Sequence, residues 1–454
     1  MRPMRQPKRG VVGAAVALAA WGGLALLGCD SSAPATGPSG QYSLAVTITA
    51  PTGVTPNVTV RGPAGYQRTL TATGTLTGIQ PGSYTVTAGA VKVAHPIAPT
   101  VYEGTVTGGS VVLGPVTTAA ASVTYGVRAG SGALWVGNVG LSGSTLVSYS
   151  AAQLAASTSA APAITIVPTP TVAPAGVAVD AQGVLWAATN DNQATNTGTG
   201  VGFLASQIQG AVSNPGAPAF PGFSLTVTSG AHEFLQGVAV DAGGNLWITN
   251  FTAGTIVEFT STQFGVQVSP TPAVTLSTIG GSLSGPAGLA FDLNGNLWAA
   301  NSSGNTVVEF TASQLTASGS PAPAVVLSAT SGSLDGPSNL AFDASGNLWV
   351  ANTNANTVVK FTAGQLLASG SPTPAVTLSG TGGSLNSPSG LALDASGDLW
   401  VANAGAGTVV EFGASQLAAT GAPAPVVTIS GSALSGPHGL AFDPPPSPPN
   451  PWDY

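Results

Sequence analysis

The sequence predicts an all-β protein, and three observations lead to that prediction. The composition favours strands and turns over helices, with 62 glycines and 36 prolines among 454 residues. Only 6% of the residues are charged and the mean hydropathy is +0.35, yet Leu, Val, Ile and Phe recur periodically, which argues against disorder. The chain also repeats a pattern of short strands around a Leu-Trp pair. Together these features predict sheets that are buried on both faces.

Residues 1–28 have the order of a secretory signal peptide. The basic head MRPMRQPKRG is followed by the apolar run VVGAAVALAAWGGLALLG and then by Cys29. The stretch Leu26-Leu27-Gly28-Cys29 resembles the bacterial lipobox, which implies acylation of the Cys29 thiol. Cys29 is the only cysteine of the chain, and this favours lipidation over a disulfide. The alternative is a single membrane-spanning anchor, because 18 apolar residues are close to the lower limit for crossing a bilayer.

We therefore expect an exported protein that is lipid-anchored to the bacterial cell envelope through Cys29. Residues 29–40 contain SSAPATGPSG, a composition typical of a flexible tether. Asp30 is a signal for inner-membrane retention in some bacteria only, so the choice between inner and outer membrane stays open. After removal of the signal peptide, five basic residues remain against 16 acidic ones, a net charge of −11. Without a basic cluster, a nucleic-acid partner is not expected.

Residues 41–127 are predicted to form a small β-sandwich that serves as a stalk. Short alternating segments such as YSLAVTIT, NVTVRG, SVVLG and ASVTYGV are separated by Gly, Pro and Asn turns. The stretch LTGIQPGSYTVTAG resembles the carboxypeptidase-regulatory-like and related immunoglobulin-like modules of bacterial surface proteins. Three polar residues here lack partners at ligand spacing, and we interpret them as ordinary surface side chains: Lys92, His95 and Glu103.

Residues 128–443 carry an internal repeat marked by six tryptophans. They are separated by 51, 61, 51, 51 and 51 residues, and they are Trp135, Trp186, Trp247, Trp298, Trp349 and Trp400. Each full unit contains a first strand (GLAFD), a tight turn (DASGN), a second strand (NLWVAN), a third strand ending in a helical turn (TVVEFTASQL) and a fourth strand (PAVTLSG). Four strands in each of six units predict a six-bladed β-propeller. Each Trp is expected to fill the space between neighbouring blades.

The two ends of the repeat region complement each other. The first unit lacks a GLAFD segment, while Gly439–Asp443 supplies one without the strands that should follow. We infer that Gly439–Asp443 pairs beside Ala133–Gly137 and closes the ring, which removes open sheet edges. Seven blades remain the alternative if the chain continues further. Residues 444–454 are a Pro-rich tail.

The pattern GPxGLAFD-x-x-GNLWVAN resembles the NHL-repeat propellers and their streptogramin-lyase-like relatives. The resemblance covers residues 130–443 and implies the propeller fold. For the lyases it also implies paired histidines and glutamates that hold Mg²⁺ at the channel mouth. His438 matches such a position, but a second ring histidine and its glutamate are missing, because His232-Glu233 lies outside the repeat register. We therefore expect no metal and no cofactor.

Three rings of equivalent positions are candidates for a binding site. The first precedes the turn Asp by five residues and varies between blades: Ala175, Gln236, Ala287, Ser338, Ser389 and His438. The second follows the Trp by three residues: Asn138, Thr189, Asn250, Asn301, Asn352 and Asn403. The third is the turn carboxylate, which we interpret as a local turn-former: Asp180, Asp241, Asp292, Asp343, Asp394 and Asp443.

The predicted binding residues come from the first two rings. They are Gln236, Ser338, Ser389, His438, Asn250, Asn301, Asn352 and Asn403, although Asn at a strand end is also a natural turn-starter. Four charged residues recur on the third strand and are expected to be solvated, away from the centre: Glu258, Glu309, Lys360 and Glu411. No hydroxyl nucleophile with a base and an orienting acid can be assembled. If there is catalysis, His438 is its candidate residue.

The function we expect is a non-catalytic binding or interaction platform, because a propeller fold does not by itself imply catalysis. Its partner would be an envelope protein, peptide or glycan, and the chain itself would be a monomer. The alternatives are an extracytoplasmic lyase or hydrolase that uses His438, and a structural surface component. Two irregular segments are candidate partner sites: the polar loop Asn190–Gly202 and the segment Ser213–Phe223, in which Phe220 and Phe223 are expected to be exposed.

Overall fold

The computed structural model describes most of the chain between residues 42 and 443. The described residues are 42–50, 54–89, 91–93, 100–114, 118–127, 132–139, 144–168, 173–180, 183–190, 198–204, 207–208, 211, 218–219, 221–227, 234–264, 270–277, 281–328, 332–380 and 383–443. The signal peptide, Cys29, the tether, His95, His232, Phe220 and the Pro-rich tail lie outside them. Within them, none of the helices has the length and apolar character that a membrane crossing requires.

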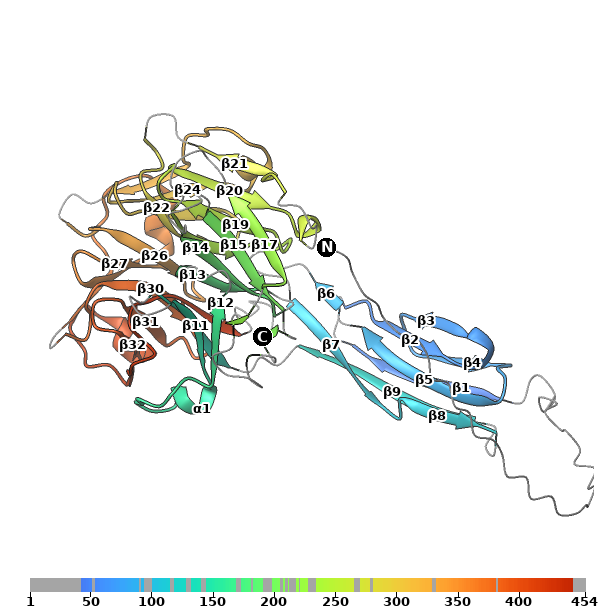
Figure 1. Cartoon of the computed structure of the whole chain (residues 1–454). Helices are drawn as coiled ribbons and strands as arrows, with labels where there is room; N and C mark the ends of the chain where they lie inside the picture. The colour runs from blue at the N-terminus through green and yellow to red at the C-terminus, as the bar shows by residue number, and fades with distance from the viewer. Residues whose placement is uncertain are drawn as a thin grey trace, which may run out of the picture.

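The N-terminal part consists of two sheets around one core (Figure 1). One sheet has the order β4 (Gly74–Thr77), β1 (Ser43–Thr49), β9 (Thr118–Val127), β7 (Thr100–Thr107) and β6 (Val91–Val93). The other has the order β3 (Gln67–Leu70), β2 (Asn57–Arg61), β5 (Gly82–Gly89) and β8 (Ser110–Leu113), and η1 (Pro63–Gly65) links β2 to β3. Strands β3, β6 and β7 add to the segments expected from the sequence. Inward residues such as Leu44, Val58 and Tyr84 are buried, in the alternation that one-sided sheets require.

The rest of the described chain forms six sheets, which we call blades 1 to 6 in chain order. Blade 1 comprises β10 (Ala133–Asn138), β11 (Thr145–Tyr149), β12 (Ile164–Pro168), β16 (Pro218–Ala219) and β34 (Pro437–Asp443), with helix α1 (Ala151–Leu154). Blade 2 comprises β13 (Ala173–Val179), β14 (Leu185–Asn190), β15 (Gly198–Phe203) and β17 (Phe223–Val227). Blade 3 comprises β18 (Leu235–Val240), β19 (Leu246–Asn250), β20 (Thr255–Phe259) and β21 (Val274–Leu276), with η2 (Ser261–Gln263).

Blades 4 to 6 repeat this plan, and only their fourth strands differ in length. Blade 4 comprises β22 (Pro286–Phe291), β23 (Leu297–Asn301), β24 (Thr306–Phe310) and β25 (Val325–Ser328), with η3 (Ala312–Thr316). Blade 5 comprises β26 (Pro337–Phe342), β27 (Leu348–Asn352), β28 (Thr357–Phe361) and β29 (Val376–Ser379), with η4 (Ala363–Leu367). Blade 6 comprises β30 (Pro388–Leu393), β31 (Leu399–Asn403), β32 (Thr408–Phe412) and β33 (Val427–Ile429), with η5 (Ala414–Ala418).

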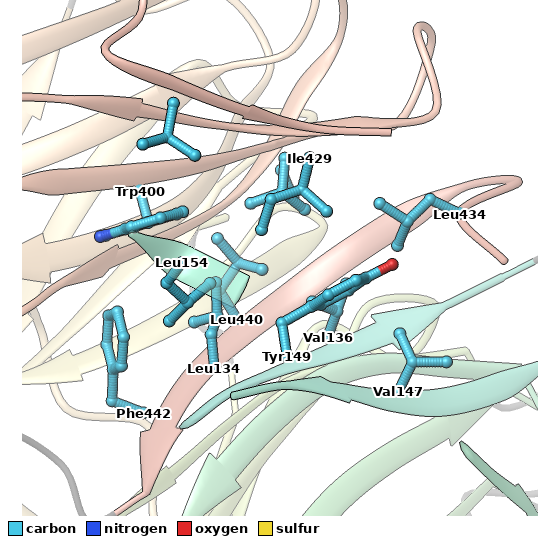
Figure 2. Close-up of a cluster of buried hydrophobic side chains, with 13 residues drawn as sticks. Leu134, Val136, Val147, Tyr149, Leu154, Trp400, Ile429, Leu434, Leu440 and Phe442 are labelled. Atoms are coloured by element: carbon cyan, nitrogen blue, oxygen red, sulfur yellow. The ribbon is translucent and has the colours of Figure 1, made fainter. Parts of the chain in front are cut away.

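The blades are held together by apolar clusters that lie between them. Every residue of β27 and β31, the strands with the sequence LWVAN, is buried, so both faces of these sheets are covered. Trp247 packs edge-on against Phe291 of blade 4, with ring centroids 6.2 Å apart. In Figure 2, Trp400 of blade 6 lies beside Leu134 and Phe442 of blade 1. The prediction that each Trp fills the space between neighbouring blades is therefore confirmed.

Strand β34 joins the two ends of the repeat region in the expected register. It pairs antiparallel with β10, with Leu134 opposite Phe442 and Val136 opposite Leu440. The innermost strands also contact one another in a cycle, in the order β34, β13, β18, β22, β26, β30 and again β34. Further from the centre, Thr158 of blade 1 forms a parallel bridge to Ile429 of blade 6. Blades 1 and 6 are thus joined at two distances from the centre.

Glycines set how closely the innermost strands approach. A Cβ atom added to Gly237 would overlap the Ala287 carbonyl oxygen of the next blade, and one added to Gly390 would overlap the His438 carbonyl oxygen. The equivalent position in blade 5 is Asn339, whose Oδ1 accepts a hydrogen bond from Leu391 N at 3.3 Å. The narrow centre of the ring therefore requires the absence of a side chain at most of these positions.

Two expectations about irregular segments need correction. The segment Asn190–Gly202 is not one loop, because its last five residues belong to β15 and pair with β14 and β17. Phe223 is not exposed beside the prolines but stacks on Trp186 with ring centroids 5.5 Å apart. Phe223 packs into the apolar cluster between blades 2 and 3, and Val201 packs into the one between blades 1 and 2, although both lie in segments whose local sequence looks loop-like.

Candidate functional site

The turn aspartates stabilise the blades, as expected from the sequence. Asp241 Oδ1 accepts hydrogen bonds from the backbone N–H groups of Gly243 and Asn245 at 2.8 and 2.9 Å. Its Oδ2 accepts one from Trp247 Nε1 at 3.0 Å. The same bond to the indole recurs at 3.1 to 3.3 Å in four other blades, from Trp186, Trp298, Trp349 and Trp400. The turn-forming interpretation is confirmed for five of the six positions, while the residues after Asp443 lie outside the described part of the chain. The bond to the indole is an addition to that interpretation.

The asparagines of the second ring are buried and hydrogen-bonded within the chain. Asn301 Oδ1 accepts from Ser284 N at 3.3 Å, and its Nδ2 donates to Ser282 O at 2.8 Å. Asn352 and Asn403 repeat this arrangement with the loops before their own inner strands. Asn250 Oδ1 accepts from Ala253 N at 3.1 Å. The amide groups of Asn301, Asn352 and Asn403 hold the loops that enter their blades, and a role of the ring in ligand binding stays a prediction.

At the first-ring position, some blades carry a polar side chain and others carry an alanine. Ser338 Oγ donates to Pro388 O at 3.1 Å, and Ser389 Oγ donates to Pro437 O at 2.9 Å, so each hydroxyl bonds to the next blade. Ala175 and Ala287 are buried and apolar. Gln236 is half-buried at the start of β18. The ring position thus joins neighbouring inner strands, and its predicted binding role remains a prediction.

His438 lies on the closing strand β34 and is half-buried. Its Nδ1 lies 2.9 Å from Gly436 O. Burial lowers the pKa of His438 below its usual value, and the hydrogen bond to Gly436 opposes that shift in part. The imidazole is therefore mostly neutral at pH 7. In the described part of the chain, no three His, Cys, Asp or Glu side chains gather in a way that could hold a metal ion.

The three glutamates of the third strand are buried, contrary to expectation, whereas Lys360 is half-buried. Glu258, Glu309 and Glu411 are each only 8% exposed. The cause is the strand register, which places each of them directly opposite the Trp of its blade, for example Glu258 opposite Trp247. Opposite residues of an antiparallel pair point to the same side of the sheet. These carboxyl groups therefore face the neighbouring blade together with the tryptophan.

Burial changes the acidity of these carboxyl groups. Desolvation, with a smaller contribution from the negative charge of Asp241, raises the pKa of Glu258 to about 7. Desolvation and the charges of Asp398 and Asp394 likewise raise the pKa of Glu411 to about 7. The pKa of Glu309 is raised by the same causes, but a hydrogen bond from the Asn296 side chain lowers it in part. Of the three, Glu309 thus has a side-chain partner that offsets its burial.

A cleft of about 480 Å³ opens where Glu258 faces blade 4. Blade 3 contributes Asp241, Trp247 and Glu258. Blade 4 contributes Phe291, Gly295 and three residues of η3, namely Ala312, Leu315 and Thr316. The cleft contains a carboxyl group beside an indole face and an apolar wall, and its volume is within the usual range for small-ligand sites. Sequence reasoning missed this cleft, although a charged residue follows the Trp by 11 residues in four of the six repeats, which was a signal.

An equivalent cleft of about 240 Å³ lies between blades 5 and 6. Here Lys360 takes the place of the glutamate, opposite Trp349. Its Nζ lies 5.0 Å from the centroid of the Trp349 ring and donates to Leu417 O at 3.2 Å. The cleft between blades 5 and 6 is therefore lined by an ammonium group of the chain itself.

The chain is a β-propeller repeat protein, as its four-stranded sheets define it. No family model and no curated protein matches the sequence. Among solved structures, a protein of unknown function from Bacteroides caccae is similar, with 12% identity and a TM-score of 0.48, over 68% of this chain and 98% of that one. Virginiamycin B lyase from Staphylococcus aureus has 15% identity and a TM-score of 0.37, over 54% and 68%. A protein from Lactobacillus plantarum has 16% identity and a TM-score of 0.44, over 66% and 82%. At these values the similarities carry no argument about ligand or activity.

Proposed function

We propose that this protein is a lipid-anchored component of the bacterial cell envelope whose propeller is a non-catalytic binding platform. The non-catalytic part of this proposal rests on the hydrogen bonds that the polar ring residues already form within the chain. The Ser338 and Ser389 hydroxyls bond to backbone carbonyls of the next blade, and the Asn301 amide bonds to the loop of its own blade. Groups engaged in this way support a rigid scaffold and are poorly placed to act on a substrate.

The anchoring half of the proposal rests on the sequence around Cys29. Its test is metabolic labelling with radioactive palmitate in a bacterial host. We expect the wild-type chain to incorporate label and the Cys29→Ala variant to incorporate none, because the thiol is the acylated group. A wild-type chain that stays unlabelled while it fractionates with membranes would overturn lipidation in favour of a spanning segment.

The platform half is tested by affinity capture. The full chain, solubilised in detergent, is used to capture components of an envelope extract, with an unrelated lipoprotein as the control bait. We expect an envelope protein, peptide or glycan to be retained in a saturable, stoichiometric manner. The absence of any such component would overturn the binding platform. A parallel capture with residues 191–197 deleted reports whether the segment between β14 and β15 takes part.

A catalytic alternative rests on His438, the half-buried imidazole of the closing strand. If His438 helped to hold a divalent cation for catalysis, adding Mg²⁺ or Mn²⁺ would raise the melting temperature of the full chain. That rise would disappear in the His438→Ala variant. For a non-catalytic platform we expect no metal-dependent rise in either protein, because the Nδ1 atom of His438 is already directed to Gly436 O.

A further inference from the structure

The cleft between blades 3 and 4 is lined by the carboxyl group of Glu258, to which no described residue donates a hydrogen bond. Glu258 is 8% exposed, lines the cleft, and receives no hydrogen bond to its carboxyl group from the described residues. The neighbouring Asp241 carboxylate differs, because it accepts hydrogen bonds from Gly243, Asn245 and Trp247. Buried carboxyl groups are normally paired or hydrogen-bonded. The Glu258 oxygens are not sealed from solvent, so a cationic or donor group that enters the cleft can bond to them.

The equivalent cleft between blades 5 and 6 indicates which group fits such a site. The two clefts correspond position by position at a distance of 102 residues, since Trp247, Phe291 and Ala312 match Trp349, Leu393 and Ala414. In the second cleft, the Lys360 ammonium lies over the Trp349 ring and donates to Leu417 O. The matching carbonyl in the first cleft is that of Leu315, which lines it.

We propose that the cleft between blades 3 and 4 binds a primary ammonium group carried on an apolar stem. The ammonium lies between the Glu258 carboxylate and the Trp247 ring and donates to Leu315 O, while the stem lies along Phe291 and Leu315. Lys360 is the internal counterpart of this ligand. The inference deepens the binding platform and rests on it, because it names one site of that platform and the chemistry it recognises.

Physical chemistry favours this ligand over an uncharged one. A carboxylate and an ammonium form a charge-assisted hydrogen bond, which is stronger when it is shielded from water. The ring face of a tryptophan attracts cations, and the attraction grows when the cation is desolvated. The cleft between blades 3 and 4 is also the larger of the two, at about 480 Å³ against about 240 Å³, so it has room for a ligand stem.

The ammonium could belong to a free amine or to a lysine side chain of a protein or peptide. Two probes distinguish these sources. n-Butylammonium supplies the ammonium and a four-carbon stem, and Nα-acetyl-lysine N-methylamide adds the flanking peptide groups. Binding of each probe to the full chain in detergent is measured by ligand-observed NMR titration. Tighter binding of the lysine derivative would assign the site to a side chain, and tighter binding of n-butylammonium would assign it to a free amine. n-Butanol serves as the uncharged control.

We expect saturable binding of n-butylammonium by the wild-type chain and none of n-butanol. The Glu258→Gln variant is expected to bind about tenfold more weakly, because it loses the charge-assisted hydrogen bond. The matched variant Glu309→Gln is expected to bind as the wild type does, because blade 4 already pairs its glutamate with Asn296. Near-ultraviolet circular dichroism of each variant verifies that the fold is intact.

Two further variants exchange the chemistry of the two clefts. In Glu258→Lys, the new side chain fills the cleft as Lys360 does, and probe binding is expected to disappear while the melting temperature is maintained. In Lys360→Glu, the second cleft acquires the carboxylate of the first, and the number of bound probes per chain is expected to rise by one. A gain of a site is an outcome that simple misfolding cannot produce.

The affinity is also expected to depend on pH. The titratable groups that line the cleft are Glu258 and Asp241, and the carboxylate form of Glu258 is the one that binds a cation. Because the pKa of Glu258 is raised to about 7, binding is expected to tighten as pH rises through neutrality. Equal binding of n-butanol and n-butylammonium, or unchanged affinity in Glu258→Gln, would overturn the cation site. Such a result would leave the binding platform itself intact, because that proposal is judged by capture of an envelope component.

Discussion

At the scale of single residues, five of the six blades repeat a hydrogen bond from the Trp indole to the carboxylate of the preceding turn. The donor and acceptor are six residues apart, and the donor–acceptor distances run from 3.0 to 3.3 Å. The indole N–H is thereby satisfied although its ring is buried between blades. A buried donor without a partner is costly, so the turn aspartate and the tryptophan depend on each other.

Replacing one of these aspartates should destabilise the propeller. Asp292 accepts hydrogen bonds from Asn294 N, Asn296 N and Trp298 Nε1. The Asp292→Ala variant leaves the indole unpaired and is expected to lose roughly 2 kcal/mol of unfolding free energy. Urea denaturation followed by tryptophan fluorescence measures this loss. Asn294→Ala, which keeps the backbone donor at an exposed position, should stay close to the wild type.

The buried Glu258 should make stability depend on pH. The folded chain holds the Glu258 proton more tightly than the unfolded chain does, because burial raises its pKa from 4.5 to about 7. The contribution of Glu258 to the free energy of unfolding is therefore greatest below pH 4.5, and it falls as pH rises towards 7. In Glu258→Gln this contribution disappears, so the urea midpoint should fall less between these two pH values. A slope equal to that of the wild type would show that the group titrates normally.

At the scale of elements, the distance between neighbouring innermost strands is determined by backbone contact rather than by side-chain packing. Gly176, Gly237, Gly288, Gly390 and Gly439 each face the backbone of the next inner strand. Strands can approach this closely only where no Cβ atom intervenes. The glycine of the GLAFD segment is thus a requirement of ring geometry and not of the turn that follows it.

Adding one methyl group to an inner strand should therefore be more damaging than adding it elsewhere. In Gly390→Ala the new Cβ atom would overlap His438 O, and strands β30 and β34 would have to separate. We expect a loss of about 1–3 kcal/mol in unfolding free energy. Gly370→Ala is the control, since no atom lies within 4 Å of its added Cβ. Equal urea midpoints for the two variants would contradict this account of the inner strands.

At the scale of the whole molecule, stability depends on contacts between blades and on the joining of the first blade to the last. Each apolar cluster of the propeller draws its residues from two adjacent blades. A blade separated from its neighbours would therefore expose most of its core. The pairing of β34 with β10 and the bridge between Thr158 and Ile429 connect the clusters into a continuous whole.

Weakening the closing strand should consequently destabilise the entire propeller. Phe442 is buried and packs edge-on against Trp400, with ring centroids 6.2 Å apart. Phe442→Ala is expected to cost about 3–5 kcal/mol in unfolding free energy, as for other buried aromatic side chains. Leu367→Ala, at a position that is 83% exposed, should change the urea midpoint little. A small effect of Phe442→Ala would show that blades 1 and 6 hold together without β34.

Much of this architecture was present in the spacing of the repeat. The Leu-Trp marker, the turn Asp and the orphan GLAFD segment predicted the four strands of each unit, the place of each Trp between blades and the partner of β34. Such features are local or periodic, and a pattern of residues along the chain records them directly. Lipid anchoring at Cys29, which was also inferred from the sequence, stays a prediction.

The cleft between blades 3 and 4 was decided only by the tertiary structure. A charged residue on the third strand looks like a solvated side chain, because the sequence does not state which blade covers it. The strand register places Glu258 opposite Trp247, and blade 4 stacks over both side chains. Only these two features together bury the Glu258 side chain. Periodicity therefore determined which strands form and that β34 pairs with β10. The burial and acidity of individual side chains arose from contacts between units far apart in the chain.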